Sequence, residues 1–164
     1  MPNRPRIDII TGPPGSGKST FIARLMASRP MQSVAIWDGA SPLPSAAGRL
    51  LLEHSGHGLP LAHMGCAGTV VAVVDGAAMA RPATAAEPET AIRSAALVYL
   101  NRTEHMGAAA KAGLLAAVWA ANPKASVLMD PIDGLNLWLL LDAAGQSGGA
   151  QGKHTQSQPQ QEAK

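Results

Sequence analysis

The sequence lacks the features that mark secreted, membrane-spanning or nucleic-acid-binding proteins. Among its 164 residues Cys66 is the single cysteine, which excludes an internal disulfide and fits a reducing compartment. No apolar stretch approaches the about 20 residues needed to span a bilayer, and no signal-peptide pattern appears. Lys and Arg are scattered without a basic run, and the formal net charge is only +2. We therefore expect a cytoplasmic protein that binds neither a membrane nor nucleic acid.

Aromatic residues are also scarce, at 3% of the chain, so the core must be built mainly from Ala, Val, Leu and Ile. The length suits one domain and not two. From Gly145 onward the composition changes to Gln, Gly, Ser and Lys, too polar to offset the entropy of ordering. We expect one domain over residues 1–144 and a disordered polar tail over residues 145–164.

Short β-branched runs alternate along the chain with alanine-rich segments of helical character. This pattern is typical of βαβ units and predicts an α/β fold with a mostly parallel central sheet flanked by helices. A surface loop is expected at 81–88. The expected strands are 7–10, 33–37, 49–53, 69–74, 95–100 and 126–129, and the expected helices are 19–28, 89–94, 105–120 and 135–144.

A complete phosphate-loop (P-loop) motif, Gly12-x4-Gly17-Lys18-Ser19, lies between the first expected strand and the first expected helix. Glycines let the backbone curl so that its N–H groups point at phosphate oxygens, beside the positive end of the helix. Lys18 is expected to face solvent and reach the β- and γ-phosphates, and the Ser19 hydroxyl to bind Mg²⁺. The nucleotide contacts are expected from Gly12, Gly15, Ser16, Gly17, Lys18, Ser19 and Thr20.

A P-loop needs an acidic residue at the end of a neighbouring strand to hold Mg²⁺, and two residues compete for this role. Asp75 ends the apolar run 70–74, and Glu53 ends the run 50–52. We favour Glu53, with Lys18 and Glu53 as the catalytic residues. The preferred interpretation of Asp75 is a strand-end residue that caps the next turn.

The segment around Glu53, Leu51-Leu52-Glu53-His54-Ser55-Gly56 followed by Pro60, resembles the Glu-x-Ser/Thr-Gly…Pro segment of the CobW-type P-loop GTPases. These are relatives of the hydrogenase and urease nickel-insertion GTPases. The resemblance continues in chain order and covers roughly residues 6 to 142. Its further segments are Val-Ala-Ile-Trp-Asp-Gly at 34–39, Val-Ala-Val-Val-Asp at 71–75, Val-Tyr-Leu-Asn-Arg-Thr-Glu at 98–104 and Ala-Asn-Pro-Lys-Ala at 121–125.

The resemblance implies a P-loop NTPase fold, Glu53 as the acid of the magnesium site and Asp38 as a switch acid near the same Mg²⁺. The sequence also departs from the family. The Gly-Cys-x-Cys-Cys metal motif of the family has no counterpart, because the interval 40–49 is too short and contains no cysteine. The chain therefore resembles a reduced or divergent member.

The base-reading motif of GTPases, Asn-Lys-x-Asp, corresponds here to Asn101-Arg102-Thr103-Glu104. Arg102 keeps the positive charge and can stack on a base, although its geometry differs from that of lysine. Glu104 keeps two acceptors for guanine on a longer arm. Asn101, Arg102 and Glu104 are thus predicted to contact the base of GTP. The alternative is an ordinary loop whose polar residues cap the following helix.

Four residues with metal-binding side chains fall within thirteen positions: His54, His57, His63 and Cys66. Imidazole and thiolate ligands at these spacings can hold Zn²⁺, Ni²⁺ or Co²⁺. The alternative is that the histidines are unrelated loop residues and Cys66 is a small buried residue before a strand.

These observations predict a Mg²⁺-dependent protein that binds GTP and hydrolyses it slowly, regulating metal delivery or a protein partner such as a metalloenzyme. A homodimer is left open. Two alternatives remain: a small-molecule kinase that uses ATP, with residues 81–88 as its lid, and a non-hydrolysing regulator controlled by a nucleotide.

Overall fold

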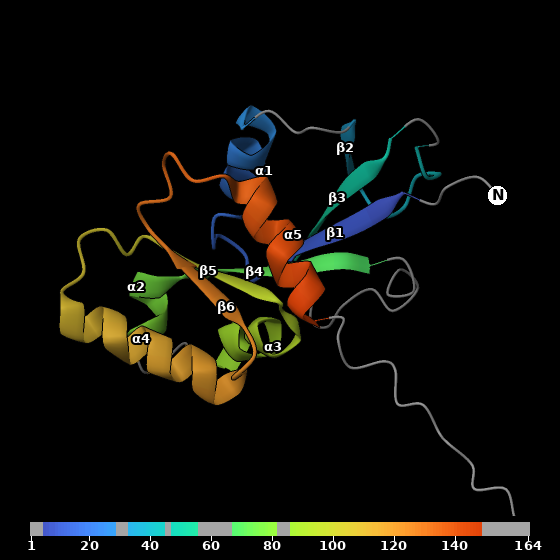
Figure 1. Cartoon of the computed structure of the whole chain (residues 1–164). Coiled ribbons are helices and arrows are strands. Elements are labelled where there is room, and N and C mark those ends of the chain that lie inside the picture. The colour runs from blue at the N-terminus through green and yellow to red at the C-terminus, as the bar shows by residue number, and fades with distance from the viewer. Residues whose placement is uncertain (1–4, 29–32, 45–46, 56–66, 82–85, 149–164) are drawn as a thin grey trace, which may run out of the picture.

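The structure, a computed structural model, describes residues 5–28, 33–44, 47–55, 67–81 and 86–148 (Figure 1). Its six strands form one parallel sheet in the order β2-β3-β1-β4-β5-β6. The strands are β1 (Arg6–Thr11), β2 (Val34–Trp37), β3 (Arg49–His54), β4 (Ala67–Asp75), β5 (Leu97–Asn101) and β6 (Ser126–Met129). The helices are α1 (Lys18–Ala27), α2 (Gly76–Met79), α3 (Ala86–Ser94), α4 (Ala108–Ala121) and α5 (Leu137–Gly148).

The α/β fold with a parallel sheet is confirmed, and all six expected strands are present. The bounds of several elements differ from the expected ones. The short helix α2 was not predicted, and α3 begins at Ala86, inside the expected loop 81–88. Helix α5 continues through Gly145 to Gly148, into the expected tail, and packs on the sheet through Leu137, Leu141 and Ala144. Residues 149–164 of the expected tail lie outside the described residues.

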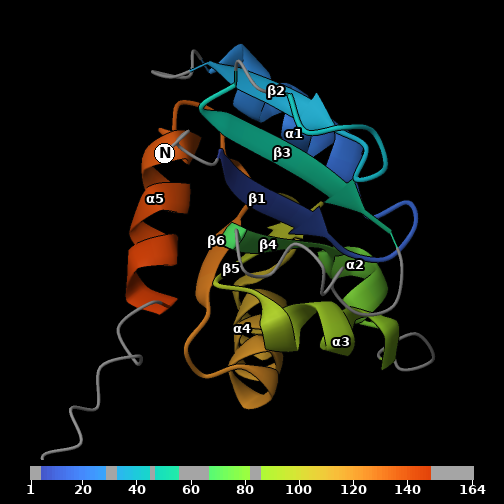
Figure 2. The ribbon, with the colours of Figure 1, turned by 90° about the vertical axis from the view of Figure 1, so that its right-hand side faces the viewer.

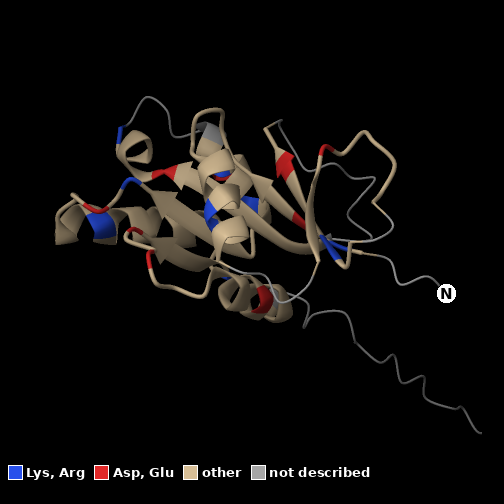
Figure 3. Cartoon of the chain, turned by 90° about the horizontal axis from the view of Figure 1, so that it is seen from above, with Lys and Arg blue, Asp and Glu red and all other residues tan. Residues whose placement is uncertain are grey.

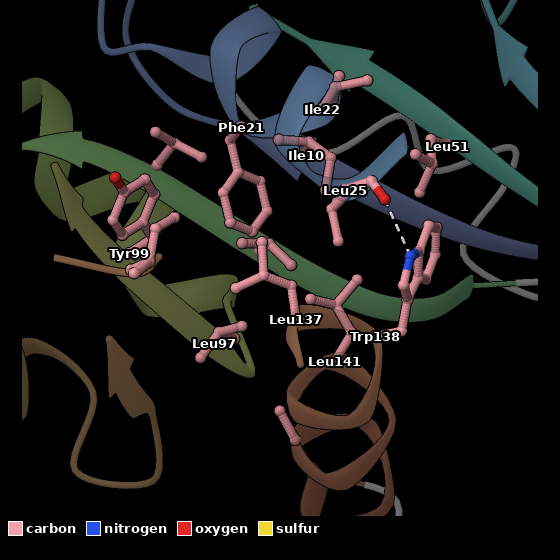
Figure 4. Close-up of a cluster of buried hydrophobic side chains, with 14 residues drawn as sticks. Ile10, Phe21, Ile22, Leu25, Leu51, Leu97, Tyr99, Leu137, Trp138 and Leu141 are labelled. Atoms are coloured by element: carbon pink, nitrogen blue, oxygen red, sulfur yellow. Dashed lines mark hydrogen bonds between the residues drawn. The ribbon is translucent and has the colours of Figure 1, made fainter. Parts of the chain in front are cut away.

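Helices cover both faces of the sheet (Figure 2). Helices α1 and α5 pack on one face through the cluster shown in Figure 4, where the Phe21 and Tyr99 rings lie 5.2 Å apart. Helices α3 and α4 pack on the other face through Ile92, Leu114 and Val118. Phe21, Tyr99 and Trp138 belong to the cluster under α1 and α5, Trp37 packs with Leu50 and Leu52 in a separate cluster at β2 and β3, and aliphatic residues supply most of the remaining core.

A group of charged side chains, of which Asp8 and Arg49 are buried, lies beneath α5, near the amino ends of β1 and β3. Asp8, fully buried, accepts hydrogen bonds from Arg6 Nε (3.1 Å), the Thr69 N–H (2.7 Å) and Arg49 Nε. Both arginines also pair with Asp142 of α5, at 3.0 and 2.9 Å. The Arg49 guanidinium lies over the Trp138 ring, 4.8 Å from its centroid. This charged cluster links α5 to β1 and β3 through ion pairs.

The carboxyl ends of the strands meet at the opposite edge of the sheet, as in every parallel sheet. Strand β1 lies between β3 and β4 there, so that the P-loop, which follows β1, has the ends of both strands as neighbours.

Basic and acidic residues are interspersed in the view of Figure 3. None of the helices in the described residues combines the length and the apolar character that a membrane span requires.

Candidate functional site

Two glycines give the P-loop its shape. Gly12 has φ +146°, and a Cβ on it would lie 2.1 Å from the Val73 carbonyl oxygen of β4. Gly17, at the N-cap of α1, has φ +99°, and a Cβ there would lie 2.3 Å from Nδ2 of Asn101. Side chains at these positions would be strained and would collide with β4 and with the end of β5. The loop is therefore fitted closely against both strands.

Lys18 lies inside this loop, and the expectation that it faces solvent was wrong. Lys18 is only 4% exposed, and its Nζ donates hydrogen bonds to the carbonyl oxygens of Gly12 (2.9 Å) and Pro13 (2.8 Å). The carbonyls of the curled loop point at the ammonium and replace its water. Burial lowers the pKa of Lys18 below its ordinary value, and the Glu53 carboxylate partly offsets this. The ammonium is thus held at the centre of the loop.

Ser19 and Glu53 are brought together although 34 positions separate them. The Ser19 hydroxyl lies 3.0 Å from Oε1 and 3.2 Å from Oε2 of Glu53. The register explains the contact: Glu53 pairs with Ile10 of β1, two residues before the P-loop begins. Both side chains are exposed at the start of α1, so that a hydroxyl and a carboxylate meet beside the loop.

Asp38 follows β2, whose last residue Trp37 pairs with Leu52, so that it lies at the edge of the sheet next to Glu53. Its carboxylate accepts hydrogen bonds from Ser41 Oγ (2.6 Å) and from the N–H groups of Ser41 (2.8 Å) and Ala40 (2.9 Å). In the described residues the structure joins Ser19 to Glu53 and not to Asp38.

These hydrogen bonds to Asp38, first that of the Ser41 hydroxyl, lower its pKa to about 2 from an ordinary value of 3.8. A carbon-13 NMR titration of the Asp38 carboxyl should therefore give a pKa of about 2. Ser41→Ala should raise this pKa, because it removes the hydrogen bond from the Ser41 hydroxyl, which lowers the pKa most. Any stabilisation by Asp38 is present above the unfolded-state pKa and is lost as the pH falls through the folded one. A pKa unaffected by Ser41→Ala would contradict this hydrogen-bond pattern.

Asp75 occupies a different place from Glu53. Thr11, the last residue of β1, pairs with Ala72, and β4 continues for three more residues to Asp75. Asp75 therefore lies beyond the carboxyl end of β1. Its carboxylate caps α2 by accepting the Ala78 N–H (3.0 Å), as the sequence led us to expect, and it pairs with Arg102. Burial raises the pKa of Asp75, but the Ala78 N–H and the Arg102 guanidinium outweigh it and leave the pKa lowered.

The segment from Asn101 to Glu104 begins at the last residue of β5 and contacts the P-loop. Asn101 Nδ2 donates to the Ser16 carbonyl oxygen (3.1 Å), and both terminal nitrogens of Arg102 lie 3.4 Å from the Gly15 carbonyl oxygen. Glu104 is exposed. Two of the three predicted base contacts thus adjoin the P-loop, and Glu104 lies open to solvent.

Asp130, directly after β6, was missed by the sequence analysis. It is 8% exposed and accepts hydrogen bonds from the Tyr99 hydroxyl (2.6 Å) and the Arg102 N–H. Burial and the Asp130 carboxylate raise the pKa of Tyr99 above its ordinary value. The position of Asp130 at the end of a strand, the same signal that identified Asp75 and Glu53, was the available clue.

Of the four residues of the predicted transition-metal cluster, only His54 is described; it ends β3 and is half-buried. His57, His63 and Cys66 lie outside the described residues. Within the parts of the chain that the structure describes, no group of three or more His, Cys, Asp or Glu side chains could hold a metal ion. The cluster remains a prediction.

The strand order, the P-loop between β1 and α1 and the helices on both faces define a P-loop NTPase fold. Solved structures share it. The hydrogenase maturation factor HypB from Archaeoglobus fulgidus matches with a TM-score of 0.59 and 18% identity, over 84% of this chain and 87% of that one. The Zn(II)-bound YjiA GTPase from E. coli matches with a TM-score of 0.61 and 17% identity, over 87% of this chain and 63% of that one.

A Zn(II)-bound triple mutant of YjiA matches similarly, with a TM-score of 0.62 and 17% identity. This chain thus spans 63% of the length of either YjiA structure. No family model matches the sequence, and no curated protein matches it. At the level of the fold, the neighbours confirm the resemblance to the CobW-type and nickel-insertion GTPases that the sequence motifs indicated.

Proposed function

We propose that this protein binds a nucleoside triphosphate with Mg²⁺, that the nucleotide is GTP, and that it hydrolyses GTP slowly. The observation that carries the proposal is the arrangement of Lys18, Ser19 and Glu53 around one loop. Lys18 supplies a positive charge within the curl of the P-loop, while Ser19 and Glu53 supply oxygen atoms at its rim. A triphosphate bound with Mg²⁺ needs these two kinds of group side by side.

The chemistry of the residues fits Mg²⁺, which prefers oxygen ligands and keeps several of its waters. Ser19 would hold the ion through its hydroxyl and Glu53 directly or through a water, in place of their present mutual hydrogen bond. When bound, Mg²⁺ neutralises charge on the phosphate oxygens. Lys18 would exchange the Gly12 and Pro13 carbonyls for the β- and γ-phosphates. Asp38, at the neighbouring strand end, is the proposed second acid near the metal.

Guanine is the proposed base because of Asn101, Arg102 and Glu104. Asn101 and Arg102 already contact the P-loop, so a base bound at this loop would belong to the same ligand as the phosphates. The Glu104 carboxylate would accept the guanine N1–H and amino group. The exposure of Glu104 favours a modest preference for guanine over adenine, because an exposed carboxylate left without these donors is still hydrated.

A role in regulating metal delivery or a protein partner in the cytoplasm is the broader part of the proposal. It is supported by the shared fold with a hydrogenase maturation factor and with a Zn(II)-bound GTPase.

The proposed transition-metal cluster of His54, His57, His63 and Cys66 belongs to this broader role. It predicts stoichiometric binding of Zn²⁺ or Ni²⁺ that is lost when His57 and Cys66 are both replaced by alanine. Metal binding that survives the double replacement would contradict the cluster.

Glu53→Gln should impair Mg²⁺-dependent GTP hydrolysis more strongly than Asp75→Asn. The amide keeps the shape of Glu53 but removes the charge that supports Mg²⁺ beside Ser19, whereas Asp75 lies at α2 and pairs with Arg102. Phosphate release at saturating GTP over a series of Mg²⁺ concentrations measures this. We expect Glu53→Gln to need about tenfold more Mg²⁺, a loss of about 1.4 kcal/mol of binding free energy.

The opposite ranking of the two variants would assign the magnesium acid to Asp75 and would weaken the correspondence with the CobW-type segment. The same assay, repeated with ATP and with candidate phosphoryl acceptors, separates the alternatives. Transfer of phosphate from ATP to an acceptor would identify a kinase, and binding without phosphate release would identify a non-hydrolysing regulator.

A further inference from the structure

Arg102 has a backbone conformation that its residue type rarely adopts. Among the described residues it is the only non-glycine residue with a positive φ, +58°. Such a conformation is costly for an L-residue and persists when surrounding contacts determine it, often at a functional site. The contacts that hold Arg102 therefore indicate what the loop after β5 is built to do.

The backbone of Arg102 is held by Asp130. One carboxylate oxygen of Asp130 accepts the Arg102 N–H, and the other accepts the Tyr99 hydroxyl at 2.6 Å. The Asp130 N–H donates to Thr103 Oγ1 at 3.0 Å, so that the end of β6 binds both sides of Arg102. Asp130 is nine-tenths buried, and Tyr99 belongs to the core cluster beneath α1 and α5. Asp130 thus anchors this loop to the core.

The side chain of Arg102 is held separately by Asp75 and the P-loop. Its Nη1 pairs with Oδ2 of Asp75, and Nη1 and Nη2 both lie 3.4 Å from the Gly15 carbonyl oxygen. Asp75 itself is fixed by the Ala78 N–H at 3.0 Å. The guanidinium, although 53% of the side chain is exposed, thus has partners on two other loops.

Asn101 completes the connection, because its amide donates to the Ser16 carbonyl oxygen and packs against Gly17. The loops after β1, β4, β5 and β6 therefore converge on Arg102 before any ligand binds. A guanidinium plane held in this way can pack on the flat face of a base, and little side-chain freedom remains to be lost on binding.

We propose that Asp130 and Asp75 are positioning residues that fix the Arg102 guanidinium beside the P-loop as a platform for the base of the bound nucleotide. Asp130 fixes the backbone of Arg102, and Asp75 fixes its side chain. This inference rests on the proposed nucleotide binding and adds to it the residues that make binding depend on the base. It predicts that affinity for the phosphates alone and affinity for the whole nucleotide respond differently to the same substitution.

The test compares GTP with inorganic tripolyphosphate, which lacks sugar and base, by calorimetric titration in Mg²⁺. The dissociation constant of tripolyphosphate divided by that of GTP measures how much affinity the sugar and the base add. We expect Asp75→Asn and Asp130→Asn each to reduce this ratio by about three- to tenfold, because an immobilised arginine would become mobile. Asp75→Asn should at the same time keep or raise the affinity for tripolyphosphate, since it removes a negative charge near the P-loop. Arg102→Ala sets the lower limit of the ratio.

An exposed acid on another element serves as the matched control. Glu89→Gln alters α3, where Glu89 pairs with Arg93 and not with Arg102. It should keep the wild-type ratio. Because Asp130 is buried, each variant is checked by circular dichroism, and Asp75→Asn carries the test if Asp130→Asn does not fold.

An unchanged ratio in folded Asp75→Asn would overturn the inference, and so would equal losses of affinity for both ligands, which indicate a merely structural role. Wild-type protein that binds GTP no better than tripolyphosphate would also overturn it, while leaving the P-loop proposal intact. Wild-type protein that binds neither ligand would overturn the proposed function itself.

Discussion

Lys18→Ala should weaken binding of Mg²⁺–GTP by at least about 100-fold. In the free protein Lys18 Nζ is held by the Gly12 and Pro13 carbonyl oxygens, in the position from which it would reach two phosphates. A hydrogen bond to a charged group contributes about 1.5–3 kcal/mol. Two such bonds correspond to about 3–6 kcal/mol, or 100-fold and more in the dissociation constant. Isothermal titration calorimetry measures the difference directly.

Lys124→Ala is the matched control, because Lys124 precedes β6 at the amino end of the sheet, opposite the P-loop. It should bind GTP as the wild type does. Lys18→Ala also deprives two loop carbonyls of a donor, so circular dichroism must show that the fold persists. A folded Lys18→Ala protein with wild-type affinity would contradict the P-loop assignment.

Asp8→Ala should reduce the free energy of unfolding by about 3–5 kcal/mol, the cost of breaking a buried ion pair by removing one partner. Asp8 is fully buried and balances Arg49, which is only 5% exposed. Without Asp8, the partners of the Arg49 charge among the described residues are Asp142 and the Trp138 ring. For a domain of this length the melting temperature should fall by roughly 6–20 °C. Urea denaturation followed by circular dichroism gives the free energy.

Two comparisons show whether the unpaired Arg49 charge causes the loss of stability. Glu89→Ala breaks an exposed ion pair with Arg93 and should cost no more than about 1 kcal/mol. Adding Arg49→Met to Asp8→Ala removes the unbalanced arginine and should restore part of the lost stability. A double variant whose loss equals the sum of the two single losses would contradict the coupling of Asp8 and Arg49.

The strands and the P-loop could be predicted because their signals are local. The apolar run 70–74 identifies a strand buried on both faces, and the glycines of the P-loop have few other uses at that spacing. The ranking of Glu53 over Asp75 came from the family resemblance. In the structure Glu53 contacts Ser19 and Asp75 caps α2, because β4 extends three residues beyond the end of β1.

The remaining features depend on contacts between residues far apart in the chain. The burial of Lys18 follows from the direction of two carbonyls in a curled loop, which the motif does not specify. The role of Asp130 depends on β6 lying next to β5, because only then can its carboxylate accept hydrogen bonds from Tyr99 and Arg102. The exposure of Glu104 likewise depends on how the loop after β5 is held.

Titration of the wild-type protein with GTP and with ATP in Mg²⁺ tests the central claim most directly. Ligand at about 100 times its dissociation constant adds about 2.7 kcal/mol to the stability, a melting shift of roughly 5–10 °C for a domain of this size. GTP should give such a shift, and ATP a shift smaller by a few degrees. The difference in binding free energy between GTP and ATP should be near the low end of the about 1–3 kcal/mol that an unpaired acceptor costs, because Glu104 is exposed. Equal shifts would contradict the guanine preference, and no shift with either nucleotide would contradict the account as a whole.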